Sequence, residues 1–239
     1  MLAHVMSDIG LVRATNEDSY ICEPPHLFVV ADGMGGHVAG EIASKLAVTT
    51  ISRYIEENDG KLEQEELLKQ AIIQANTSIY QLSLSKEEFT GMGTTVTAIY
   101  MDKNTAYWGH VGDSRIYLLR KEEFRQITDD HSLVWELVQS GNITKEDAKI
   151  HPKRNMLTRA VGTSCLIKID TGVTELEPGD IILMCTDGLT NMVGEQDIYN
   201  LLKNPQDNLE SMVNQLIVNA KNAGGSDNIT TILLKNGDA

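Results

Sequence analysis

Carboxylates recur in this sequence at one kind of place, next to an apolar run that reads as a buried strand. The four positions are Asp32 after Leu27–Ala31, Asp113 after Tyr107–Gly112, Asp187 after Ile181–Thr186 and Asp227 before Ile229–Leu234. A glycine follows both Asp32 and Asp187, and a glycine lets the backbone approach a ligand closely. One Asp-Gly pair is more often a tight turn. Four carboxylates at strand ends, with Asn16-Glu17-Asp18 near the N-terminus, indicate a shared site instead.

Such a site needs neutralising cations or protons, because crowded carboxylates raise one another's pKa. All the candidate ligands are hard oxygens, and the sequence has no Cys/His cluster with zinc spacing and no EF-hand loop. Oxygen-only ligands select Mg²⁺ or Mn²⁺ over zinc or copper. The pattern therefore predicts two such ions, about 3.5–4 Å apart, sharing a bridging water whose pKa they lower.

Two ions that hold a hydroxide suit in-line attack on phosphorus, which also needs a cation for the phosphoryl oxygens. Arg13 stands three residues before Asn16-Glu17-Asp18, and its planar guanidinium can bind phosphate through two hydrogen bonds. A lone arginine beside acids is more often a salt-bridge partner, but the carboxylate cluster favours the phosphate role. The signatures of cysteine phosphatases, aspartyl-phosphate phosphatases, serine hydrolases and P-loop enzymes are missing. Direct attack by water remains.

The composition limits which classes of partner the protein can bind and in which cellular compartment it can reside. The formal charge of −14, from 20 basic and 34 acidic residues, disfavours nucleic acid and anionic membrane surfaces. Three cysteines without metal spacing fit a reducing compartment. The N-terminal residues lack the apolar segment of a signal peptide, and no apolar stretch approaches the ~20 residues of a membrane span. We therefore expect a cytoplasmic protein that contacts neither membrane nor nucleic acid.

The elements that must position these residues follow from apolar periodicity. Helical spacing covers 39–55, 68–82 and 209–220, and short apolar runs at 27–30 and 181–185 fit strands buried on two faces. Several β-rich runs between 94 and 127 are separated by two or three turn residues each, including Gly112-Asp113, and this predicts consecutive hairpins. The chain therefore reads as one α+β domain over residues 1–239, with a flap near 131–164 that contains a short helix at 132–139.

Eight short motifs occur between residues 13 and 230. They are Arg13–Asp18, Val30–His37, Gly91–Thr95, Gly109–Arg115, Ile127–Ser132, Leu157–Gly162, Cys185–Leu189 and Gly225–Thr230. Together and in this order they resemble the metal-dependent Ser/Thr protein phosphatases of type 2C, in the compact bacterial form. The resemblance implies a four-layer α-β-β-α sandwich, in which two antiparallel sheets are flanked by helix pairs and the metal centre lies at one end. It also implies an enzyme that hydrolyses phosphomonoesters of serine and threonine, opposing a bacterial Ser/Thr kinase. We expect the protein to be a monomer.

The resemblance further assigns roles by position in this chain. Asp32 would bridge two Mn²⁺ or Mg²⁺ ions, and the carbonyl of Gly33 would bind one of them. Asp187 and Asp227 would complete the shell of the other ion. Three roles outside this core are also implied. Glu17 and Asp18 would act largely through coordinated waters, Asp113 together with Asp187 would bind a third ion, and Arg13 would bind the substrate phosphate.

One position departs from the pattern of animal relatives, which follow Asp-Gly with a histidine proposed to protonate the leaving alcohol. Here that position is Met34, which cannot donate a proton. His37 is the nearest titratable candidate. A locally hydrogen-bonded role for His37 and proton donation by a metal-bound water stay open as alternatives.

The expected flap is basic within an acidic protein, and its cations are Lys145, Lys149, His151, Lys153 and Arg154. A solvated helix face explains them, and docking of phosphorylated segments is the functional alternative.

Three other functions compete with a general phosphatase. A phosphatase dedicated to one regulatory switch protein shares its chemistry. An inactive phosphoprotein-binding module conflicts with the intact carboxylates, and a two-metal phosphodiesterase acting on nucleic acid conflicts with the charge.

Overall fold

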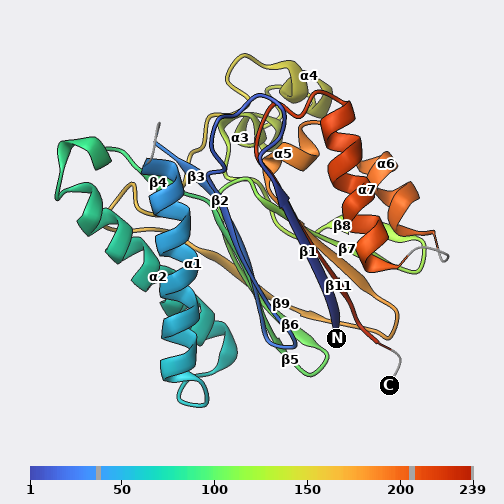
Figure 1. The fold of residues 1–239 in the computed structure, drawn as a ribbon, viewed down its shortest axis with the longest axis horizontal. Coiled ribbons are helices and arrows are strands. Elements are labelled where there is room, and N and C mark those ends of the chain that lie inside the picture. The colour runs from blue at the N-terminus through green and yellow to red at the C-terminus, as the bar shows by residue number, and fades with distance from the viewer. Residues whose placement is uncertain (36–38, 205–207, 238–239) are drawn as a thin grey trace.

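Two antiparallel sheets packed face to face form the centre of the computed structural model, which describes residues 1–35, 39–204 and 208–237 (Figure 1). The first sheet has the order β1 (Leu2–Asp8), β11 (Ile229–Lys235), β10 (Ile181–Cys185), β7 (Arg115–Arg120) and β8 (Glu123–Gln126). The second has the order β2 (Asp18–Glu23), β3 (Leu27–Met34), β5 (Val96–Asp102), β6 (Thr105–Val111) and β9 (Asp170–Glu175). The short strand β4 (Gly93–Thr94) pairs with the end of β3.

The central strands are buried on both faces, which explains their continuous apolar runs. In β3, Phe28 and Val30 belong to the cluster between the two sheets, whereas Val29 and Ala31 belong to the cluster under the helices. Strand β10 alternates in the same way, because Ile182 and Met184 face the other sheet. The expectation of doubly buried strands at 27–30 and 181–185 is therefore confirmed.

Helices cover the outer face of each sheet. The pair α1 (Ala39–Asn58) and α2 (Gln64–Ser83) packs on the second sheet, and α7 (Leu209–Asn222) with α5 (Asp187–Thr190) and α6 (Glu195–Leu202) packs on the first. Figure 1 shows these helix layers on opposite sides of the sheets. The four-layer α-β-β-α sandwich is confirmed. The helices predicted at 39–55, 68–82 and 209–220 are also present, each with slightly wider bounds.

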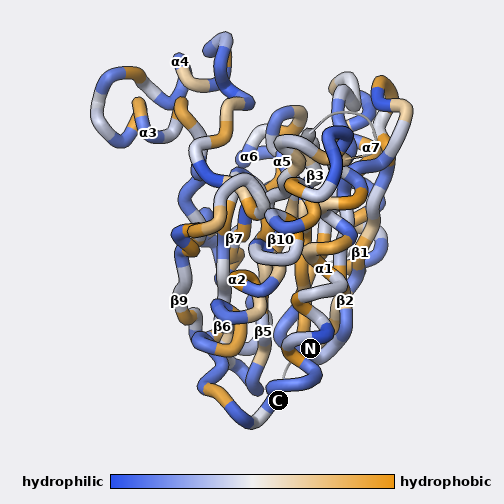
Figure 2. The backbone as a smooth tube through the Cα atoms, turned by 90° about the vertical axis from the view of Figure 1, so that its left-hand side faces the viewer, coloured by the Kyte–Doolittle hydropathy of each residue, from blue (hydrophilic) through white to orange (hydrophobic). Residues whose placement is uncertain are grey.

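The flap carries α3 (Leu133–Gln139) and α4 (Lys145–Ile150), which project from the body of the sandwich (Figure 2). Helix α4 begins with a reciprocal pair of hydrogen bonds between Thr144 and Asp147, an N-terminal capping box. At its C-terminal root the flap returns to the body through a bridge between Val161 and Thr94. None of the helices in the described ranges is long and apolar enough to cross a bilayer.

The expectation of consecutive hairpins fails at Gly112-Asp113. Strands β6 and β7 belong to different sheets, so the chain crosses from one sheet to the other at this turn. Gly112 has a φ of 117°, and a Cβ there would lie 2.5 Å from Thr95 Cγ2. Both facts require glycine. The crossing matters for function because it places Asp113 at the end of the sandwich where the two sheets meet.

Candidate metal centre

A cavity of about 460 Å³ opens at this end of the sandwich. Four acids line it: Asp32 near the end of β3, Asp113 at the crossing, Asp187 at the start of α5 just after β10, and Asp227 just before β11. The other predicted site residues that line it are Arg13, Glu17 and Gly33. The ends of strands from both sheets therefore place these carboxylates around one cavity. In the sequence the carboxylates are up to 195 residues apart, which is the separation between Asp32 and Asp227.

Asp18 lies directly behind the cavity, opposite Asp32 in the β2–β3 register. Its Oδ2 accepts hydrogen bonds from the hydroxyls of Thr186 at 2.9 Å and Thr230 at 2.7 Å. Its buried Oδ1 has no hydrogen-bond partner among the described residues. Burial, with smaller contributions from the charges of Asp187 and Asp227, raises the pKa of Asp18 to about 7. The two hydroxyls oppose this rise only in part, since they favour the charged form.

The other acids show the same crowding. Burial and the charge of Asp227 raise the pKa of Asp187 to about 6. Burial and the neighbouring carboxylates also hold the pKa of Asp32 and of Asp113 well above the ordinary range. Asp187 Oδ2 accepts a hydrogen bond from Asn191 at 2.9 Å, but within residues 1–35, 39–204 and 208–237 nothing donates a hydrogen bond to its buried Oδ1.

These features fit a divalent cation. Two buried carboxylate oxygens without partners and four acids with raised pKa values form an environment that positive charge would relieve. All the donors are oxygens, as Mg²⁺ and Mn²⁺ prefer. Within residues 1–35, 39–204 and 208–237, no three His, Cys, Asp or Glu side chains are arranged to hold an ion as they stand. Binding would therefore require carboxylates to turn toward the ion, or waters and main-chain oxygens to complete its shell.

Arg13 reaches the cavity but contacts an acid there. Its Nη2 donates to Asp227 Oδ2 at 2.8 Å, and this hydrogen bond raises the pKa of Arg13. The arginine side chain remains 48% exposed, against 24% for its partner. A salt bridge is the commoner role for an arginine beside acids, and Arg13 forms one. This salt bridge lies inside the cavity, and the guanidinium remains accessible to solvent.

Asn228 is a structural residue of the site that the sequence analysis did not single out. Its side-chain NH₂ donates to the carbonyls of Ile9 and Thr15, and its Oδ1 accepts from the main-chain N–H of Glu17. One buried amide therefore holds both ends of the loop that carries Arg13. Asparagine is common in turns, so only the tertiary contacts reveal this role.

The main chain at Asp32 and Gly33 is fixed from two sides. Asp32 donates its N–H to Thr95 Oγ1 at 2.9 Å, and its carbonyl accepts the main-chain N–H of Thr95 at 2.8 Å. Gly33 packs against the start of α1 so closely that a Cβ would lie 2.0 Å from the Gly40 carbonyl oxygen. Glycine is required here for close approach of the backbones and not for a left-handed conformation.

The candidate proton donor His37 lies outside the described residues. Met34, the residue that replaces the histidine of animal relatives, lines the cavity itself.

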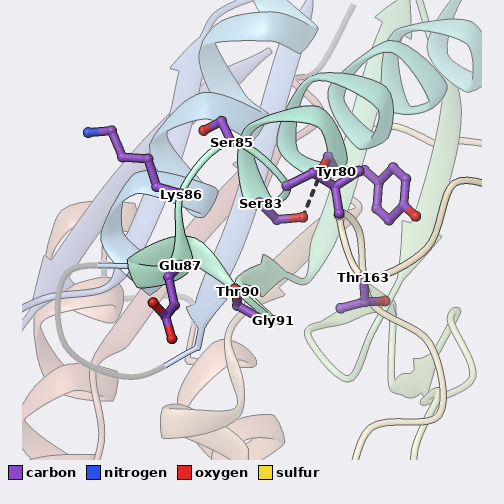
Figure 3. Close-up of a pocket in the computed structure, with 10 residues that line it drawn as sticks. Tyr80, Ser83, Ser85, Lys86, Glu87, Thr90, Gly91 and Thr163 are labelled. Carbon is purple, nitrogen blue, oxygen red and sulfur yellow. Dashed lines mark hydrogen bonds between the residues drawn. The ribbon is translucent and has the colours of Figure 1, made fainter.

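A second cavity of about 480 Å³ lies at the C-terminal end of α2, beside the short helix η1 (Glu87–Phe89) and the end of the flap segment (Figure 3). Tyr80, Ser83 and Thr163 are among its lining residues, and Glu87 is the one acidic residue in this lining within the described part of the chain. It lacks the crowded acids of the first cavity, so the candidate chemistry belongs to the first.

A layered sandwich with an acid-lined cavity between its sheet ends is the architecture that the sequence resemblance implied for metal-dependent phosphatases. Residues 14–233 match the family model of protein phosphatase 2C. The serine/threonine phosphatase stp of Listeria welshimeri is 40% identical over 98% of this chain and 96% of its own length. The protein phosphatase PhpP of Streptococcus pneumoniae is 39% identical over 96% and 95%, respectively.

Solved structures agree with these sequence relatives. The serine/threonine phosphatase PstP/Ppp of Mycobacterium tuberculosis superimposes with a TM-score of 0.91 at 37% identity, covering 99% of both chains. A PstP catalytic domain in complex with two manganese ions superimposes with a TM-score of 0.90 at 35% identity, covering 99% of this chain and 98% of that one. The chain therefore belongs to the protein phosphatase 2C family. It is an enzyme of the phosphoprotein phosphatase class.

Proposed function

We propose that this protein hydrolyses phosphoserine and phosphothreonine monoesters in proteins, at the cavity that holds Asp32, Asp113, Asp187 and Asp227. The observation that carries this proposal is the convergence of these carboxylates from both sheets, with Arg13 at the same cavity. Divalent ions bound there would supply an activated water for attack on phosphorus and would stabilise the charge of the phosphoryl oxygens. The relatives named serine/threonine phosphatases support the choice of substrate.

The carboxylates divide into three roles in this proposal. Asp32 would bridge two Mn²⁺ or Mg²⁺ ions, the Gly33 carbonyl would bind one of them, and Asp187 with Asp227 would hold the other. The partnerless Oδ1 of Asp187 supports its assignment as a ligand. The manganese in the related PstP domain supports Mn²⁺ as the ion.

Asp18 would act through coordinated waters, together with Glu17. The orphaned Oδ1 of Asp18 is available as an acceptor, whereas its Oδ2 is committed to two threonine hydroxyls. Asp113 stands at the rim of the same cavity and would hold a third ion with Asp187. That assignment is supported by the raised pKa of Asp113, whose causes are burial first and the charge of Asp187 second.

Arg13 would bind the substrate phosphate. Its half-exposed guanidinium has one nitrogen on Asp227, and an arginine has five N–H donors, so others remain for phosphoryl oxygens. A bidentate arginine orients a phosphate for in-line attack better than a lysine can.

The partners and the setting are inferred from charge and composition. An opposing Ser/Thr kinase follows from the proposed substrate. The net charge of −14 supports a protein substrate over nucleic acid. We expect a cytoplasmic monomer made of one catalytic domain over residues 1–239, with three free cysteines that fit a reducing compartment.

The proposal is tested by phosphate release from a phosphothreonine peptide, with and without Mn²⁺. EDTA should stop the reaction, and added Mn²⁺ should restore it. A generic aryl phosphate should show the same dependence, because the chemistry does not need a peptide. Hydrolysis that persists in excess EDTA would contradict the metal-dependent mechanism, and hydrolysis of the aryl phosphate alone would contradict the choice of protein substrate.

A further inference from the structure

A buried histidine at the base of the flap bonds directly to the turn that carries Asp113. His131 is 4% exposed. Its Nδ1 accepts the main-chain N–H of Gly112 at 3.1 Å, and its own main-chain N–H donates to the Gly112 carbonyl at 2.7 Å. Two reciprocal hydrogen bonds therefore join His131 to the residue immediately before Asp113.

The ring of His131 is oriented by a second set of contacts. Because Nδ1 accepts a hydrogen bond, the proton of the neutral ring is on Nε2, which donates to Asp170 Oδ2 at 3.0 Å. Asp170 is held in turn by Arg159, whose Nη1 donates to Oδ1 at 2.8 Å. A carboxylate that fixes the tautomer and orientation of a histidine is the usual arrangement behind functional sites.

The turn needs such support because its geometry is unusual. Gly112 has a positive φ of 117° and lies against Thr95, the residue that bonds to the main chain of Asp32. The turn lies between β6, which ends at Val111, and β7, which begins at Arg115 in the other sheet, so the chain is crossing between the sheets there. The two bonds from His131 supply hydrogen-bond partners that a sheet ladder would otherwise provide.

His131 also connects the turn to the flap. Its carbonyl accepts the N–H of Thr158 at 2.8 Å, and the next residue, Ser132, forms a bridge with Leu157. Leu157 lines the metal cavity. One residue therefore contacts both the Asp113 turn and the flap segment that closes one side of the cavity.

We propose that His131 is a positioning residue that fixes the Gly112–Asp113 turn at the rim of the cavity, with Asp170 and Arg159 orienting its ring. The consequence for ion binding rests on the proposed function, in which Asp113 is a ligand. A misplaced turn moves the carboxylate of Asp113 away from the ion, which weakens binding at that position without removing any ligand.

Two amide variants separate the contacts of the ring. The side-chain oxygen of His131→Asn can stand where Nδ1 stands and accept from Gly112, whereas the longer His131→Gln reaches the position of Nε2 and contacts Asp170. His131→Ala removes both contacts. Asp180→Asn is a matched control for general destabilisation, because Asp180 is also buried, bonds to Arg120, and precedes β10 at the end opposite Asp187.

The first measurement is hydrogen exchange of the Gly112 amide by NMR in EDTA, where no ion contributes. Exchange should become about 5–10-fold faster in His131→Ala and His131→Gln, as for the loss of one hydrogen bond, and should stay near that of the unmodified protein in His131→Asn. Unchanged exchange in His131→Ala, recovery by Gln instead of Asn, or equally fast exchange in Asp180→Asn overturns the proposal.

The second measurement is Mn²⁺ titration followed by electron paramagnetic resonance, with Asp113→Asn as the reference. The weakest-bound ion should be lost in the reference. In His131→Ala it should need on the order of 10–100-fold more Mn²⁺, the usual effect of removing the support of a ligand. If Asp113→Asn binds all its ions normally, the assignment of Asp113 as a ligand fails, while the exchange of Gly112 still decides the role of His131.

Discussion

Replacing Asp18 by asparagine should stabilise the metal-free protein at neutral pH and above. Asp18 is 8% exposed, and its pKa is raised from 3.8 to about 7, chiefly by burial. This difference is about three pKa units, and each unit is worth about 1.4 kcal/mol. Ionised Asp18 therefore costs the metal-free protein on the order of 4 kcal/mol of unfolding free energy.

The pH dependence follows from the direction of the shift. Below about pH 4 the carboxyl is protonated in both the folded and the unfolded states, so it costs nothing. As pH rises from about 4 to about 7, the unfolded chain ionises while the folded protein keeps its proton, and stability is lost. Above about pH 7 the loss is constant. Asp18→Asn should therefore gain most at pH 8 and little at pH 4.5.

The assay is thermal unfolding in EDTA across this pH range, followed by circular dichroism. At pH 8 the melting temperature of Asp18→Asn should exceed that of the unmodified protein by roughly 8–16 °C, given ~2–4 °C for each kcal/mol in a chain of this size. Saturating Mn²⁺ should remove or reverse the difference, because bound cations neutralise the carboxylates. A variant that is less stable at pH 8, or equally stabilised at every pH, would refute the electrostatic argument.

Asp8→Asn is the matched control of opposite sign. Burial works against ionisation of Asp8, but hydrogen bonds from Lys221 and from the Gly10 N–H outweigh it and lower its pKa. A lowered pKa contributes stability above the unfolded value and loses it as pH falls through the folded value. Asp8→Asn should therefore destabilise the protein at pH 8 and have less effect in acid.

Three further changes probe the site and the flap. Asp187→Asn should lower kcat for a phosphothreonine peptide at least about 100-fold without lowering the melting temperature in EDTA, and full activity would count against the site. Lys153→Ala/Arg154→Ala should lower kcat/KM several-fold on phosphoproteins but not on an aryl phosphate, and unchanged kinetics would end the docking hypothesis. Gly33→Ala places a Cβ 2.0 Å from the Gly40 carbonyl oxygen, so urea titration should show a loss of about 3 kcal/mol or more, and normal stability would contradict the close packing.

Local patterns in the sequence predicted much of the fold. Apolar spacing identified the helices at 39–55, 68–82 and 209–220, because a helix face has a short period that adjacent residues reveal. Continuous apolar runs at 27–30 and 181–185 identified the doubly buried strands. The edge strands β1, β2 and β9 were not predicted individually, since their half-buried residues carry a weaker pattern.

The turn at Gly112-Asp113 shows where local reasoning stops. Two turn residues between two β-rich runs predict a hairpin, yet the strands pair with β5 and β10 in separate sheets. Which partner a strand takes depends on burial of both its faces in the finished sandwich, and this is a property of the whole chain. The sequence correctly predicted a turn at Gly112-Asp113, but the turn connects two sheets instead of two paired strands.

The sequence by itself determined which residues could do chemistry, since acids beside buried strands and an arginine near the N-terminus are visible without coordinates. Only the tertiary structure decided how they are held. Asn228 fixing the Arg13 loop, the threonine hydroxyls on Asp18, and His131 on Gly112 are all contacts between distant segments. Hydrogen bonds of this kind depend on separations of a few ångströms between groups far apart in the chain, and no local pattern encodes them.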